Sequence, residues 1–223
     1  MKYKHLPQEG LKLIACVTML LDHIGASVFP SLLLRIIGRV SFPIYCFLLS
    51  EGIRHTRSPR KYLLRLGIGA LLSEIPFDLL FYGRLTFGAQ NVMLTLFLGA
   101  AMLLAFQRTS RTILRLLWIA LACVLAELLQ TDYASKGILL ILLFYMTDRF
   151  LICLPGMLLI FLPSGYLRFC GLPVPMGLFT LPALIPISLY SGRKLSHSRA
   201  VQWIFYFFYP AHLAALFAIK FLL

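Results

Sequence analysis

Residues 11–29 read LKLIACVTMLLDHIGASVF, and this stretch decides the fold class. Its length matches the roughly 20 residues that an α-helix needs to cross the hydrocarbon core of a bilayer. Lys12, Asp22 and His23 are its only acidic, basic or histidine side chains. An apolar run of this length with so few charges predicts a membrane-spanning helix.

The rest of the chain has the same character. Of its 223 residues, 60% are hydrophobic and 13% are charged, and the mean hydropathy is +0.88. Soluble domains are typically about 45–50% apolar and about 25% charged. A soluble fold would need more polar surface than this, and a disordered chain would not carry 18 Phe and 10 Tyr. The composition therefore excludes both classes and predicts an integral membrane protein.

The apolar runs predict an all-α, polytopic membrane helical bundle of about nine transmembrane helices, within a range of about eight to ten. The chain shows no internal repeat and no long linker, so residues 1–223 are expected to form a single transmembrane domain. Two of the runs are too short to cross a bilayer upright, namely 137–147 and 150–162. The expected spans are 11–29, 31–50, 62–80, 91–106, 112–130, 137–147, 150–162, 174–190 and 201–221.

The basic residues predict the orientation of these spans. The formal net charge is +13, and its Lys and Arg residues concentrate in the N-terminal arm and in the gaps at 51–61, 107–115 and 191–200. Threading the spans from a cytoplasmic N-terminus places every basic gap in the cytoplasm, as the positive-inside rule requires. Membrane lipids and topology thus explain the charge, so nucleic acid is not expected as a partner.

Several polar side chains fall inside the spans, where they are costly unless they face an interior or a water-filled space. At a rise of about 1.5 Å per residue, they come out at similar depth. The sequence therefore predicts that a base, a cation and a carboxylate converge. The residues at this depth are Asp22, His23, Arg39, Glu74 and His212, and further polar residues expected around them are Asp78, Asn91, Asp132 and Tyr209.

Two alternatives stay open for the first span. An intramembrane histidine is more often a hydrogen-bonding residue between helices than a catalyst. Asp22 projects about 100° away from His23 on a helix, so it can pair with Arg39 instead of orienting the imidazole.

A histidine in a partly dry cavity, with a carboxylate near enough to fix its tautomer, is a general base for an amine or a hydroxyl. The gap at 51–61 adds cations that suit a polyphosphate. A ligand with phosphates there and a reactive group about 16 Å deeper, by the helical rise, has to be long and thin, as acetyl-CoA is. The cations expected to bind it are Lys12, Arg54, His55, Arg57, Arg60 and Lys61.

The cysteines are expected to be packing residues. There are five, four of them inside apolar runs, and no two form a CxxC motif. Neither a disulfide framework nor a metal site is expected. They are Cys16, Cys46, Cys123, Cys153 and Cys170.

Dense motifs mark the two ends of the chain. They are Leu11-Lys12, Thr18 to Gly25, Gly38-Arg39, Phe42-Pro43, Glu51-Gly52, Arg54 to Arg57, Lys61 to Leu66, Ser73 to Leu79, Gln90 to Val92, Asp132-Tyr133 and Phe205 to Leu213. Through these motifs the chain resembles the TraX family, whose namesake is linked to N-acetylation of pilin subunits. Where that family has Asp-Tyr-Gly, this chain has Ala134 in place of the glycine.

The resemblance implies a membrane acyltransferase. Lys12 followed by His23 is similar to the basic-residue and histidine signature of transmembrane acyltransferases, in which the histidine is considered catalytic. By this resemblance His23 is the base, and Asp22 or Glu74 is its partner. Arg39 would then stabilise the developing negative charge.

The sequence thus predicts acetyl transfer from cytoplasmic acetyl-CoA to an amine or hydroxyl of a peptide, sugar or lipid acceptor. The enzyme is expected to be a multi-pass protein of the bacterial cytoplasmic membrane. A proton-coupled transporter is one alternative, because proton relays also place acids and histidines at midmembrane depth. A non-catalytic membrane component of a secretion or conjugation assembly is another.

Overall fold

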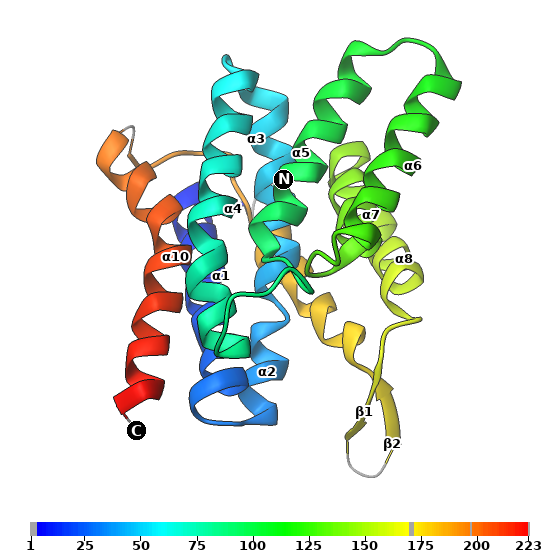
Figure 1. The fold of residues 1–223 in the computed structure, drawn as a ribbon. Helices are drawn as coiled ribbons and strands as arrows, with labels where there is room; N and C mark the ends of the chain where they lie inside the picture. The colour runs from blue at the N-terminus through cyan, green and yellow to red at the C-terminus, as the bar shows by residue number, and fades with distance from the viewer. Residues whose placement is uncertain (1–3, 170–171, 197, 223) are drawn as a thin grey trace. The chain divides into compact units, whose positions relative to one another are not determined.

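The computed structural model describes residues 4–169, 172–196 and 198–222. The regular secondary structure of these residues is helical apart from one short hairpin, so the predicted helical class is confirmed (Figure 1). Within these described ranges, three helices are long and apolar enough to cross a membrane, namely Gln8–Val28, Leu32–His55 and Ala200–Leu222. The other described helices are shorter or more highly charged, so the count of about nine spans stays a prediction.

The chain divides into two compact units. The first unit combines Met1–Tyr45 with Thr147–Leu223, and the second unit is Cys46–Met146. Helix α3 (Ser41–His55) starts in the first unit and continues into the second.

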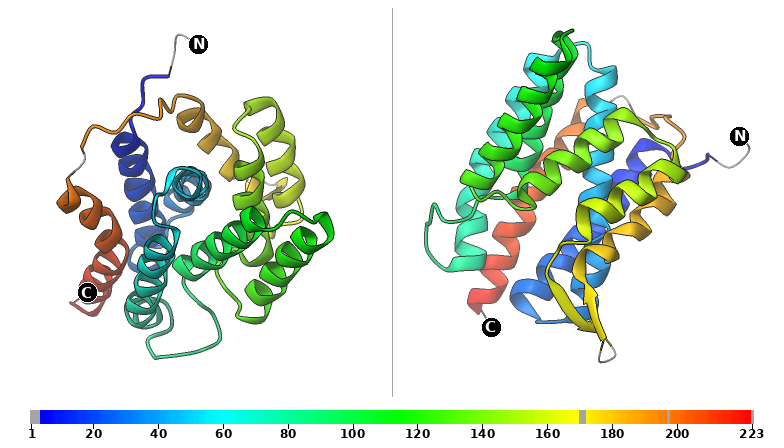
Figure 2. Two further views of the ribbon diagram at one scale, coloured as in Figure 1. Left: turned by 90° about the horizontal axis from the view of Figure 1, so that it is seen from above. Right: turned by 90° about the vertical axis from the view of Figure 1, so that its right-hand side faces the viewer.

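The first unit is organised around α1, which contacts both α2 and α10. Its C-terminal helix α10 lies beside α1 although the two are far apart in sequence (Figure 2). A π-helical segment, η1, continues α1 toward the turn that leads into α2. The elements of this unit besides α3 are α1 (Gln8–His23), η1 (Ile24–Val28), α2 (Leu32–Gly38), α8 (Phe150–Phe161), β1 (Tyr166–Phe169), β2 (Leu172–Pro175), η2 (Met176–Ala183), α9 (Leu184–Ser188) and α10 (Arg199–Leu222).

Three predicted segments differ from the structure. The span expected at 31–50 is broken between α2 and α3 and extends to His55. The gap expected at 163–173 and the first two residues of the next expected span contribute to the antiparallel pair β1–β2. The span expected at 174–190 is replaced by β2, the 3₁₀ helix η2 and the short α9. Prolines at 173, 175, 182 and 186 explain the last difference, because each removes a helical N–H donor and restricts the residue before it.

The second unit is a bundle in which α5 contacts α4, α6 and α7. Pro59 opens α4 at a position where its missing N–H costs nothing, and Gly83 closes that helix at a φ of 66°. Asn91 caps α5 by accepting a hydrogen bond from the Met93 amide. Helices α5 and α6 form an antiparallel pair joined by a short turn (Figure 1). The helices besides α3 are α4 (Pro59–Tyr82), α5 (Val92–Arg108), α6 (Thr112–Leu128) and α7 (Ala134–Met146).

The loop between α6 and α7 has an unusual backbone. Gln130, Tyr133 and Ala134 all have positive φ, with Ala134 at 42°. Main-chain bonds tie this loop to Gln90, since the Gln90 amide donates to Gln130 at 3.1 Å and the Asp132 amide donates to Gln90 at 3.0 Å. The left-handed region costs a residue with a Cβ about 1–2 kcal/mol. Ala134 therefore carries backbone strain in this loop.

We expect the Ala134→Gly variant to raise the free energy of unfolding by up to about 1 kcal/mol, because glycine adopts positive φ without a steric penalty. Thermal unfolding of the detergent-solubilised protein measures this change. Ala101→Gly in the interior of α5 is the matched control and is expected to lower the same quantity by about 1 kcal/mol. A loss of stability at position 134 would contradict the strained backbone.

Candidate functional site

His23 and His212 form the polar centre of the first unit. His23 ends α1 on the helix face that also buries Leu11, Ala15 and Met19. Its Nδ1 lies 2.7 Å from His212 Nε2, and the two rings are almost parallel, at an interplanar angle of 4°. Both side chains are buried, with exposures of 9% and 7% for the two residues. Such a short contact requires one ring to donate and the other to accept.

The main chain of α10 determines which ring donates. His212 Nδ1 lies 2.7 Å from the carbonyl oxygen of Phe208, one turn earlier. A carbonyl oxygen only accepts, so this nitrogen carries a proton, and Nε2 of the neutral ring carries the lone pair. His23 Nδ1 therefore donates to His212 Nε2, and the lone pair of a neutral His23 lies on its Nε2. The network assigns one basic nitrogen to the pair.

Aromatic rings hold the two imidazoles in place. Phe208 stacks on His212, with ring centroids 4.8 Å apart. Tyr209, which is buried, meets His23 and His212 edge-on, at centroid distances of 6.1 and 5.6 Å. Tyr209 therefore lies next to the pair.

Asp22 lies in an ionic cluster with two arginines of the α2 region. Its Oδ2 accepts from Arg35 Nη1 at 2.7 Å, and its Oδ1 accepts from Arg39 Nη2 at 2.9 Å. The side chains of Asp22 and Arg39 are 14% exposed and that of Arg35 is 29% exposed. The pairing with Arg39 that the sequence left open is thus the observed one, and His212 is the residue on His23 Nδ1.

Arg35 is the member of this cluster that the sequence reasoning missed. The signal was present, because Arg35 and Arg39 are four residues apart and therefore share one face of a helix. Two glycines allow the close approach of α2 to α1. A Cβ added at Gly38 would collide with the Cβ of Asp22, and one added at Gly25 would lie 2.7 Å from the Cβ of Leu34.

Lys12 lies near the start of α1, and His23 is the last residue of that helix. Its Nζ is 5.0 Å from the ring centroid of Phe205 in α10, which is a cation–π contact. The eleven residues to His23 correspond to about 16 Å at the helical rise. Lys12 therefore contributes to the α1–α10 contact at the opposite end of α1 from the imidazole pair.

Glu74, Asp78 and Asn91 belong to the second unit. The Asn91 amide group donates to Glu74 and to the carbonyl of Ala70, the latter at 2.9 Å. Asp78 accepts from the Thr86 amide at 2.8 Å and so anchors the loop between α4 and α5. These contacts give the Asn91 amide group its partners and pair one carboxylate oxygen each of Glu74 and Asp78, and the convergence of the three residues with His23 stays a prediction.

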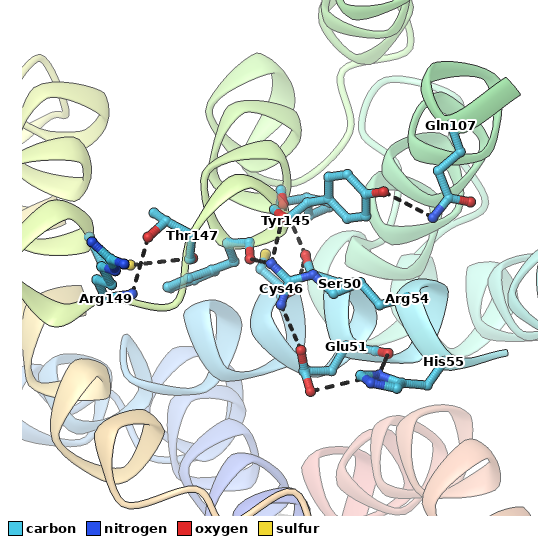
Figure 3. Close-up of polar contacts among 12 residues, drawn as sticks. Cys46, Ser50, Glu51, Arg54, His55, Gln107, Tyr145, Thr147 and Arg149 are labelled. Carbon is cyan, nitrogen blue, oxygen red and sulfur yellow. Dashed lines mark hydrogen bonds and ion pairs between the residues drawn. The ribbon is translucent and has the colours of Figure 1, made fainter. Parts of the chain in front are cut away.

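Arg54 connects α3 to the end of α7 (Figure 3). Its guanidinium donates to Glu51 at 2.7 Å and to the carbonyls of Phe144 and Tyr145 at 2.9 and 2.5 Å. The carbonyls at a helix end lack helical partners, so Arg54 caps α7. These contacts are structural, and the predicted part of Arg54 in phosphate binding stays a prediction.

The remaining cations of the predicted phosphate site surround the turn from α3 to α4. His55, Arg57, Arg60 and Lys61 are all exposed. His55 Nδ1 donates to the carbonyl of Glu51 at 2.9 Å. The turn therefore presents an exposed group of positive charges, as phosphate binding would need.

Asp132 is exposed, and its described contacts are made by the main chain. Its carbonyl accepts from the hydroxyl of Thr95, and its amide donates to Gln90. Among the described residues no group of three or more His, Cys, Asp or Glu side chains is arranged to hold a metal ion. Cys16, Cys46, Cys123 and Cys153 have free thiols, and Cys170 lies outside the described residues.

A model of the family described as TraX protein matches residues 7–220. The chain belongs to the TraX family. This TraX protein is 31% identical to a probable fimbrial assembly protein FimC, serogroup H1, of Dichelobacter nodosus, and the similarity covers 94% of each chain. An uncharacterized protein of Rickettsia prowazekii (strain Madrid E) is 30% identical over 103 residues, which is 46% of this chain and 38% of that protein. No solved structure matches the chain.

We expect Gly38→Ala to destabilise the TraX protein by about 1–3 kcal/mol, because the added methyl group has to displace Asp22 or move α2 away from α1. Thermal unfolding in detergent measures this loss. Gly165→Ala is the matched control, since a Cβ at Gly165 meets no atom within 4 Å. Equal stability of the two variants would contradict the close approach of α2 to α1.

Proposed function

We propose that this TraX protein is a membrane-embedded acyltransferase that moves an acetyl group from acetyl-CoA to an amine or hydroxyl, with His23 as the general base. The observation that supports this function is the hydrogen-bonded series from the Phe208 carbonyl through His212 to His23. The series leaves His23 Nε2 as the basic nitrogen and holds its ring in a fixed orientation. A histidine with a fixed tautomer is what general-base catalysis requires.

The proposed acyl transfer needs only His23 and His212 for its proton transfers. His23 Nε2 takes the proton from the acceptor, whose nitrogen or oxygen attacks the thioester carbonyl and forms a tetrahedral oxyanion. Collapse of this intermediate forms the amide or ester and breaks the carbon–sulfur bond, and the leaving thiolate takes the proton back from His23. His212 accepts the Nδ1 hydrogen bond throughout and thereby stabilises the imidazolium, the role that a carboxylate has in serine-protease triads.

Arg39 supplies positive charge for the oxyanion in this proposal. Asp22 holds the guanidinium at 2.9 Å, and Asp22 and His23 are neighbours in the chain. Preorganised charge near a developing oxyanion is among the largest contributions to catalysis. Asp22 thus positions a cation, and His212 positions the base.

The phosphates of acetyl-CoA are proposed to bind the exposed cations at the α3–α4 turn. Arg57, Arg60 and Lys61 are exposed there, and Arg54 anchors the helix that carries the turn. Charge-assisted hydrogen bonds from several cations suit a polyphosphate. We propose that this turn and Lys12 lie on the cytoplasmic side of a multi-pass protein in the bacterial inner membrane.

A second candidate is a non-catalytic component of a fimbrial assembly. The relative in Dichelobacter nodosus, named as a probable fimbrial assembly protein, favours it because the similarity covers nearly all of both chains. In this case the buried polar residues would serve only folding. An enzyme and a scaffold differ in whether a folded His23 variant keeps its function.

We expect His23→Ala to insert and fold but to abolish transfer of radiolabelled acetyl groups from acetyl-CoA in membrane vesicles of the native host. His212→Ala is expected to lower the rate by about 10²–10⁴-fold and to alter its pH profile, because the tautomer of the base is no longer fixed. The control is His5→Ala, an exposed histidine near the N-terminus. Wild-type transfer by folded His23→Ala would remove the mechanism, whereas absence of transfer by the wild-type protein would favour the scaffold.

We expect the triple variant Arg57→Gln, Arg60→Gln and Lys61→Gln to raise KM for acetyl-CoA by about tenfold or more, with a smaller change in kcat. The reason is the loss of three cations that attract the phosphates. Arg111→Gln, an exposed arginine in the turn before α6, is the control. An unchanged KM would place the cofactor phosphates elsewhere.

A further inference from the structure

Two acidic residues of α4 each have a buried carboxylate oxygen without a protein partner. Glu74 and Asp78 are four residues apart, so they share one face of the helix. Glu74 Oε1 and Asp78 Oδ1 are buried and accept no hydrogen bond from the described residues. Asp78 as a whole is only 2% exposed. Burying a charged oxygen without a partner is costly, so a bound cation would stabilise the pair.

The described side chains do not supply that positive charge. Neither Glu74 nor Asp78 belongs to an ion pair within the described residues. Arg84, the nearest cation along the chain, lies exposed in the loop after α4. Like charges four residues apart on a helix also destabilise each other. When both groups are ionised, the pair therefore carries two negative charges that the described side chains do not neutralise.

The loop that joins α4 to α5 fixes the second oxygen of each carboxylate (Figure 1). Asp78 Oδ2 accepts from the Thr86 amide at 2.8 Å. Glu74 Oε2 accepts from the side-chain amide of Asn91 and, at 3.4 Å, from its main-chain amide. Side chains at this helical spacing have Cβ atoms about 5–6 Å apart. One ion at about 2.3–2.6 Å from an oxygen of each carboxylate can therefore bridge them.

The groups available at this pair are hard oxygen ligands. Two carboxylates match the charge of a divalent cation, and histidine or cysteine ligands, which suit zinc, do not complete a metal site among the described residues. Because the two oxygens are buried, the ion has to shed most of its water. Mg²⁺ usually keeps several waters in a strict octahedron, whereas Ca²⁺ accepts irregular sets of carboxylate and main-chain oxygens. These features fit Ca²⁺ better than Mg²⁺.

We propose that Glu74 and Asp78 bind a Ca²⁺ ion beneath the loop between α4 and α5. Main-chain carbonyls of that loop complete the coordination. The loop residues from Gly83 to Gly88 are exposed except for Thr86, which gives the ion a way in. The ion joins α4 to the loop and, through Asn91, to the first turn of α5, which Asn91 caps. The site lies within the second unit and does not depend on the proposed acyl transfer.

The test measures Ca²⁺ binding by the purified full-length protein in detergent after treatment with EDTA. Equilibrium dialysis with radioactive calcium reports the bound ion, and thermal unfolding reports its effect on stability. We expect the wild type to bind Ca²⁺ and its Tm to rise by about 5 °C or more at saturation. Glu74→Gln and Asp78→Asn are each expected to lower the affinity for Ca²⁺ by about tenfold or more. Glu127→Gln, an exposed acid of the same unit, is the control and keeps the wild-type affinity.

The two amide variants are matched to the local structure. Gln at position 74 and Asn at position 78 keep an oxygen that accepts from Asn91 and from the Thr86 amide, so the loop keeps its anchors. If a variant does not fold, the wild-type titration decides, because absence of Ca²⁺ binding by the wild type overturns the site. Unchanged Ca²⁺ binding by both folded variants overturns the assignment to these residues. Equal binding of Mg²⁺ supports a divalent-cation site and overturns Ca²⁺ as its occupant.

Discussion

The structure depends on one constraint, which is that charged and polar side chains withdrawn from water need partners within the protein. Unpaired ionic groups are costly in lipid, and hydrogen-bonded or ion-paired ones are tolerated. The first unit meets this constraint where α1 ends. Asp22 forms ion pairs with Arg35 and Arg39, and His23 shares a hydrogen bond with His212. These contacts tie α1 to α2 on one side and to α10 on another.

Adjacent residues of α1 thus serve two different partners. Side chains of neighbouring helical residues diverge by about 100°, so Asp22 and His23 face different helices. The carboxylate holds cations in place, while the imidazole is oriented by a second imidazole and a main-chain carbonyl. A fixed positive charge therefore lies beside a fixed base. This arrangement supports the proposed acyl transfer.

The second unit uses its polar residues to fasten loops and helix ends. Asn91 caps α5, Asp78 holds the loop before that helix, and Arg54 caps α7. Such partners satisfy main-chain groups that the helices leave open. The exposed cations at the α3–α4 turn are different, because a solvated loop does not require them for its backbone. The polar residues of the second unit therefore differ in what they do for the structure.

The sequence by itself determined the helical class, most helix positions and the polar residues inside the expected spans. Long apolar runs and rare intramembrane charges leave few alternatives. It also contained the family motifs, and the family match confirms that resemblance. It did not determine the hairpin at 166–175 or the short helices that follow, where closely spaced prolines outweigh apolar composition. Only the tertiary structure decided that His212 orients His23 and that Arg35 joins Asp22. The physical reason is that a side chain's partner depends on how helices distant in sequence pack. A helical sequence pattern does not show that α2 approaches α1 closely at Gly38.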